Sequence, residues 1–119
     1  MLIISNNPKV EDYFSTERVE LLSGSYYDVL LRVRDYVHQN YVLLTHPLSG
    51  SIKPNETPYK SIAIEKSDKL DFDSLGLVEK AIDTYVKLQK DIATPVWPDR
   101  IKEDFMVIDF DLIKNALKK

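Results

Sequence analysis

The chain has 119 residues, a length that predicts one domain, 1–119, with a core of its own. Its net charge of −3 and pI near 5.3 argue against a nucleic-acid-binding protein, which normally carries a basic excess. The absence of cysteine excludes disulfides, thiolate metal sites and cysteine nucleophiles. No signal-peptide pattern and no membrane-length apolar run occurs, so we expect a cytoplasmic protein that does not bind a membrane.

The first third of the chain alternates short strands and helices. Leu2–Ile4 predicts a short buried strand. Asn7 followed by Pro8 is typical of a helix start, with Asn as the N-cap and Pro at the first helical position. Val19–Leu22 predicts a second strand.

A longer helix is predicted over Tyr26–Gln39, where apolar residues recur at helical spacing. Ser25 with Asp28 three residues later indicates a capping box at its start. Asn40 fits the left-handed residue that ends many helices. The apolar run Tyr41–Thr45 then predicts a third strand, buried on both faces.

The second half continues the alternation. Ser61–Glu65 predicts a fourth strand, and Asp71–Gln89 predicts the longest helix. The apolar run Phe105–Ile108 predicts a fifth strand, after which Asp109 or Asp111 caps a last helix.

Strands that alternate with helices predict an α/β fold, a single-domain layered sandwich with a mostly parallel sheet of about five strands flanked by helices. The long connection before the fourth strand can serve as a crossover or as a broad hairpin. The direction of that strand therefore stays open.

The segment Thr45–Tyr59 is the most unusual part of the sequence. Connections inside compact domains usually have about 2–6 residues, and longer ones are commonly functional or disordered. This segment holds half of the six prolines, and fixed φ angles lower the entropic cost of ordering one conformation. We therefore expect the functional centre here.

Polar residues follow the first and third predicted strands, and ligands of parallel α/β sheets bind beyond such strand ends. If these strands are neighbours, the two polar segments share one rim. Amides, hydroxyls and a lysine beside a helix start suit a small anionic or zwitterionic ligand. The candidate ligand-binding residues are Asn6, Asn7, Thr45, His46, Ser49, Ser51, Lys53 and Asn55.

Other chemistries find less support. The sequence has neither the Walker spacing nor a G-x-G-x-x-G run, and its two histidines lack matched carboxylates, so we expect no cofactor and no metal. His46 could serve as an acid or base near neutral pH. The alternative is that its imidazole donates to a backbone carbonyl and holds the turn into Pro47. Trp97, between two prolines, is either an anchor for a partner or a lid packed on the core.

The run Leu44-Thr45-His46-Pro47-Leu48-Ser49-Gly50-Ser51-Ile52-Lys53-Pro54-Asn55-Glu56-Thr57-Pro58-Tyr59-Lys60-Ser61 resembles the GrdX family. The runs Ile4-Ser5-Asn6-Asn7-Pro8, Val33-Arg34-Asp35-Tyr36-Val37-His38 and Trp97-Pro98 are similar to that family's pattern as well. These small proteins are encoded beside the subunits of glycine, sarcosine and betaine reductase in anaerobic amino-acid fermenters. The resemblance implies this context and assigns no catalytic or binding residue.

Three hypotheses follow, in this order. The first is an accessory protein that docks on glycine reductase subunits through the loop 45–59. The second is a binder or sensor of a small anionic or amino-acid-derived metabolite. The third is a His46-dependent enzyme, so enzymatic activity stays open. Small α/β domains are commonly dimers, and we expect a homodimer on that basis alone.

Overall fold

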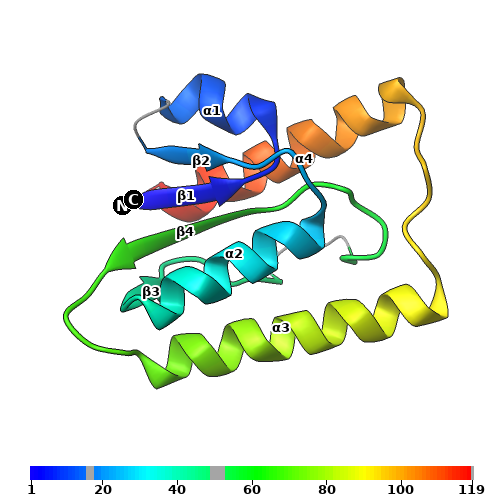
Figure 1. Cartoon of the computed structure of the whole chain (residues 1–119). Helices are drawn as coiled ribbons and strands as arrows, with labels where there is room; N and C mark the ends of the chain where they lie inside the picture. Colours follow the sequence, from blue (N-terminus) through cyan, green and yellow to red (C-terminus); the bar gives the residue numbers. More distant parts are fainter. Residues whose placement is uncertain (16–17, 49–52, 119) are drawn as a thin grey trace.

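A computed structural model describes residues 1–15, 18–48 and 53–118. Within them, four strands form one sheet with helices on both faces (Figure 1). The elements in chain order are β1 (Leu2–Ser5), α1 (Pro8–Phe14), β2 (Val19–Leu21), α2 (Tyr26–His38), β3 (Tyr41–Leu43), β4 (Ser61–Lys66), α3 (Phe72–Asp91) and α4 (Asp99–Leu117).

The sheet has the strand order β2-β1-β4-β3. β1 pairs with β2 in parallel, whereas β4 is antiparallel to both of its neighbours, with Ile62 opposite Ile4 and Ile64 opposite Leu43. The prediction of a mostly parallel sheet of about five strands is therefore wrong, although the α/β class is right. The physical reason is that the long connection after β3 is a broad hairpin, so β4 returns between β3 and β1.

The predicted signals at the ends of α1 and α2 are confirmed, whereas the predicted cap of the last helix at Asp109 or Asp111 is wrong, because α4 already begins at Asp99. The Asn7 side chain caps α1 by accepting a hydrogen bond from the Lys9 amide at 3.1 Å. Ser25 and Asp28 form the expected capping box at the start of α2. Asn40 has a φ of 71°, the left-handed conformation predicted for the residue that follows α2.

Two apolar layers hold the helices on the sheet (Figure 1). On one face α2 lies against the strands and α3 packs beside it, in a cluster that includes Ile62, Val33 and Val78. On the other face α1 and α4 enclose a smaller cluster that includes Ala63 and Ile113. Both clusters follow from the alternation of side chains along β4.

The predicted fifth strand, Phe105–Ile108, is wrong because this run belongs to the helix α4. The helical repeat of apolar residues in α4 is interrupted at Asp109. Asp109 and Ile113 are the residues that α4 buries, four positions apart on one face. Since a carboxylate occupies a buried position where an apolar residue is expected, the stripe looks interrupted, and the apolar run before it resembles a strand.

Gly76→Ala is expected to raise the free energy of unfolding by about 0.5–1 kcal/mol, because alanine loses less backbone freedom in a helix. Gly76 is exposed within α3, and a Cβ built there meets nothing within 4 Å. Urea denaturation measures the effect. Gly24→Ala is the matched control and should destabilise, since its Cβ would collide with the Asp28 carboxylate of the capping box. Equal effects of the two changes would contradict the explanation.

Candidate functional site

A chain of buried hydrogen bonds joins the end of β1, the start of β4 and the middle of α4. The Asn7 amide donates to Ser5 Oγ at 2.9 Å, and the hydroxyls of Ser5 and Ser61 are 2.7 Å apart. Ser61 Oγ donates to Asp109 Oδ2 at 2.7 Å, so the Ser5 hydroxyl is the donor to Ser61. Asn7 Nδ2 also donates to Oδ2, at 3.0 Å. Every donor in this series of hydrogen bonds therefore points toward the Asp109 carboxylate.

Lys60, directly before β4, is the second buried charged residue of this region. Its residue exposure is 5%, and that of Asp109 is 6%. We call Ser5, Asn7, Lys60, Ser61 and Asp109 the buried polar cluster. Charged side chains are seldom buried to this degree unless they are paired or have a role in a site, so the cluster is the candidate functional site.

Burial is the largest effect on the pKa values of both Asp109 and Lys60. It raises the pKa of Asp109, against the opposing effects of the hydrogen bonds from Asn7 and Ser61 and of the positive charge of Lys60. Burial lowers the pKa of Lys60 to about 8, and the Asp109 carboxylate opposes that shift. The region can therefore exchange a proton with solvent in the mildly alkaline range, where an ordinary lysine stays charged.

Asn6 lies beside the cluster and fixes the loops around it. Its Nδ2 donates to the carbonyls of Gly24 at 3.0 Å and Pro58 at 2.8 Å, and its Oδ1 accepts from the Lys60 amide at 2.9 Å. One buried side chain thus joins the loop after β1 to the loop before α2 and to the segment that enters β4. Its amide groups are used in holding the backbone around Lys60.

The other predicted site residues that the structure describes lie outside the five members of this cluster. Thr45 Oγ1 accepts from the Ala63 amide at 3.0 Å. β1 and β3 are not neighbours, because β4 separates them, so the predicted shared rim is wrong in that respect. His46 is exposed and its Nδ1 accepts from the Leu48 amide at 3.0 Å, a local turn contact. Lys53 is exposed.

Two of the candidate residues, Ser49 and Ser51, lie outside the described residues. Their predicted part in ligand binding stays a prediction, as do the ligand roles of Thr45, His46 and Lys53.

Asn55 and Trp97 connect the described part of the long loop with the segment 92–98 that joins α3 to α4, which we call the strap. Asn55 Nδ2 donates to the Ile92 carbonyl at 3.1 Å, and Trp97 Nε1 donates to the Glu56 carbonyl at 2.8 Å. The indole also lies against Phe105, with ring centroids 5.6 Å apart. Trp97, which is half-buried, therefore holds the strap on the loop.

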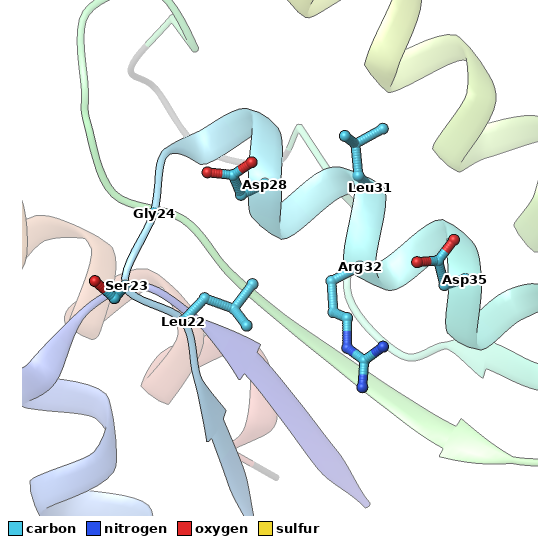
Figure 2. Close-up of a pocket in the computed structure, with 7 residues that line it drawn as sticks. All are labelled: Leu22, Ser23, Gly24, Asp28, Leu31, Arg32 and Asp35. Atoms are coloured by element: carbon cyan, nitrogen blue, oxygen red, sulfur yellow. The ribbon is translucent and has the colours of Figure 1, made fainter.

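A separate open groove of about 340 Å³ lies between the loop after β2 and α2. Figure 2 shows Asp28, Arg32 and Asp35 along α2, with Leu22 and Ser23 on the opposite wall. Asp28 is part of the capping box, and Arg32 Nε donates to Glu20 Oε2 at 2.6 Å. Since these two charges already serve α2 and its contact with β2, the groove is a weaker candidate than the buried polar cluster.

Sequence reasoning missed Lys60, Ser61 and Asp109. Ser61 was assigned only to a strand, and Asp109 only to a helix cap. The signal that could have found Asp109 is its place in the row Phe105, Asp109, Ile113, where a charged residue interrupts an otherwise apolar helical face. Lys60 carries no comparable signal, because its burial depends on the approach of α4.

The fold defines the class of the protein, a mixed α/β protein. Its buried polar cluster contains two residues of opposite charge, Lys60 and Asp109, close to where α4 packs on the sheet. The chain belongs to the GrdX-like protein family, whose model matches residues 2–118. No curated protein and no solved structure matched the chain. Among the described residues, no helix combines the length and apolarity that a membrane span requires.

Proposed function

We propose that the protein is a cytoplasmic accessory protein of the glycine, sarcosine and betaine reductase system, and that it acts by docking on a reductase subunit. Membership of the GrdX-like family supports the context. The proposed docking surface combines the described part of the loop 45–59 with the strap.

The observation that supports this proposal is that the strap exposes two apolar side chains while hydrogen bonds hold its backbone in place. Val96 is 96% exposed and Ile92 is 69% exposed. The bond from Asn55 to the Ile92 carbonyl and the bond from Trp97 to the Glu56 carbonyl hold the strap at both ends. A segment fixed before binding loses less conformational entropy on association, so apolar contacts made by Val96 contribute more fully to affinity.

The protein alone gains nothing from this arrangement, because Val96 leaves almost all of its surface in water. A partner that covers it would gain apolar burial worth about 25 cal/mol for each Å² removed from water. Each reductase subunit is therefore a candidate partner, and an apolar recess on one of them is the expected complement.

Binding of purified reductase subunits to the immobilised protein tests the proposal. We expect one subunit to bind the parent and to bind Val96→Asp at least about tenfold more weakly, since burying an unpaired carboxylate opposes association. Phe72→Asp is the matched control. Phe72 is 76% exposed and lies at the start of α3, a 20-residue helix that spans about 30 Å, whereas the strap begins at its other end.

Absence of binding to every subunit would refute the docking role. Equal weakening by Val96→Asp and Phe72→Asp would refute the strap as its location. Light scattering on the parent alone gives its molar mass, which also tests the predicted homodimer.

A further inference from the structure

An open groove lies on the surface between α1 and α4, on the face of the sheet opposite α2 and α3 (Figure 1). Its volume is about 500 Å³, and a second hollow of about 370 Å³ continues it toward the end of α4. No residue of the buried polar cluster or of the strap lines either hollow. We call the larger hollow the α1/α4 groove, and the residues that line it are Lys9, Asp12, Tyr13, Val107, Phe110 and Asp111.

The middle of the α1/α4 groove is apolar and remains in contact with water. Tyr13 is 57% exposed and Val107 is 43% exposed. The Tyr13 ring stands edge-on against the Phe110 ring, with centroids 5.2 Å apart, so packing within one chain already orients it. A side chain that is ordered beforehand loses less conformational entropy on association. An oriented, exposed tyrosine beside apolar side chains is typical of the residues that anchor protein interfaces.

The rim of the groove carries charges of both signs in equal number. Lys9 and Asp12 are three positions apart on α1, and Asp111 and Lys114 are three positions apart on α4. Residues at this spacing are neighbours on a helix surface, so each helix has one positive and one negative group along the groove and its continuation. A partner with one dominant sign of charge would be attracted by half of these groups and repelled by the other half. The rim therefore favours a partner with the same balanced charges.

We propose that the α1/α4 groove is the interface of a homodimer with two-fold symmetry. The axis lies in the plane of the contact and crosses both helices, so that α1 and α4 each pack antiparallel to their copies. Lys9 then faces the partner's Asp12, and Asp111 faces the partner's Lys114. The two-fold axis repeats both contacts, so opposite charges meet on every side of the apolar middle of the groove.

The contacts that the charged groups make within one chain are compatible with this interface. Lys9 Nζ lies 2.6 Å from Glu103 Oε1, but the two side chains are 35% and 56% exposed, and exchange of such a surface ion pair costs little. Lys114 Nζ lies 5.3 Å from the centre of the Tyr13 ring, a cation–π contact that a neighbouring carboxylate can share. Burial of the apolar middle therefore supplies the affinity, and the charges determine how the two copies are oriented.

Light scattering on the purified protein at micromolar concentrations tests the dimer. We expect the parent to have twice the 13.8 kDa mass of one chain. Val107→Asp should weaken the dimer at least about tenfold, because it places a carboxylate in the apolar middle of the groove. Leu77→Asp is the matched control. Leu77 is 40% exposed but belongs to α3, on the opposite face of the sheet, so its substitution should leave the dimer unchanged.

Charge reversal tests which groups face each other. The double variant Asp12→Lys, Asp111→Lys makes all four rim charges positive, and the double variant Lys9→Glu, Lys114→Glu makes all four negative. Each variant alone should be monomeric at concentrations where the parent is dimeric, since like charges then face each other. An equimolar mixture should form a one-to-one heterodimer, because each pair again joins opposite charges. Recovery of the dimer in the mixture also shows that both variants are folded.

Three results would overturn the proposal. They are a monomeric parent, a Val107→Asp variant that dimerises as strongly as the parent, and a mixture of the two charge variants that stays monomeric. These measurements need no reductase subunit. Val96→Asp changes the strap and leaves the groove intact, so we expect it to remain dimeric. Failure of the dimer and failure of the docking proposal are therefore distinguishable.

Discussion

Asp109→Leu is expected to lower the free energy of unfolding by about 3–5 kcal/mol, the range found when one partner of a buried charge pair is removed. The substitution removes the negative charge that favours the buried Lys60 ammonium and deprives Ser61 of its acceptor. A loss of this size is a large fraction of the total stability of an ordinary domain, about 5–15 kcal/mol. Urea denaturation followed by circular dichroism measures it.

Asp109→Asn removes the charge of the side chain and keeps an oxygen that can accept hydrogen bonds. The amide oxygen can still accept from Ser61 and Asn7, and the raised pKa of Asp109 indicates that burial already disfavours its charged form. Both variants lose the charge that faces Lys60, so we expect Asp109→Asn to be more stable than Asp109→Leu by about 1–3 kcal/mol, the cost of leaving a buried donor without its acceptor. If Asp109→Leu were as stable as the parent, the hydrogen-bond chain would not be holding α4 on the sheet.

The double variant Asp109→Leu, Lys60→Met removes both charges. Since Asp109→Leu removes a carboxylate that favours the Lys60 ammonium, we expect the double variant to be more stable than Asp109→Leu by at least about 1 kcal/mol. Strictly additive effects would instead show that Lys60 and Asp109 do not interact.

The caps of α1 and α2 were predictable because their causes are local. Asn7 and Ser25 each bond to an amide two or three residues away, so a few residues of sequence specify the conformation. The direction of β4 was not predictable in this way. It depends on whether the long loop crosses the sheet or turns back, and pairing of Ile62 with Ile4 across 58 residues decides it. Such non-local pairing leaves no short-range pattern.

The candidate site was predictable only where its residues lie close together in the sequence. Asn6 and Asn7 follow a buried strand, and polar residues at such a position are expected at a site. Lys60 and Asp109 belong to segments 49 residues apart, and only the packing of α4 on the sheet buries them together. In sequence, a buried carboxylate resembles a helix cap. For this reason the last helix was predicted to begin at Asp109 or Asp111, and Asp109 was not predicted as a site residue.

The free energy of unfolding is expected to rise by about 2 kcal/mol between pH 8 and pH 10 through Lys60 alone. Its pKa is about 8 in the folded protein and near the ordinary value of 10.5 in the unfolded chain. Between these values the unfolded chain binds more protons, so stability increases with pH. Each pH unit contributes at most about 1.4 kcal/mol, and below pH 8 the buried ammonium is destabilising in full.

Other groups with displaced pKa values also contribute to the pH dependence. Burial raises the pKa values of Tyr26, Tyr36, Tyr59 and Tyr85, so the folded protein retains these protons longer and loses stability as the unfolded tyrosines ionise around pH 10. The raised pKa of Asp109 lowers stability as pH rises through the acid range. Lys60→Met keeps these tyrosines and Asp109, so the difference between the parent and this variant reports on Lys60.

Urea denaturation of the parent and of Lys60→Met at several pH values across this interval isolates the effect. The parent should gain about 2 kcal/mol relative to Lys60→Met between pH 8 and pH 10, because methionine has no proton to lose. Lys66→Met retains Lys60 and should follow the parent. Parallel curves for the parent and Lys60→Met would mean that Lys60 titrates as an ordinary solvated lysine. In that case burial would not disfavour the Lys60 ammonium, and Lys60 would lose its place in the candidate site.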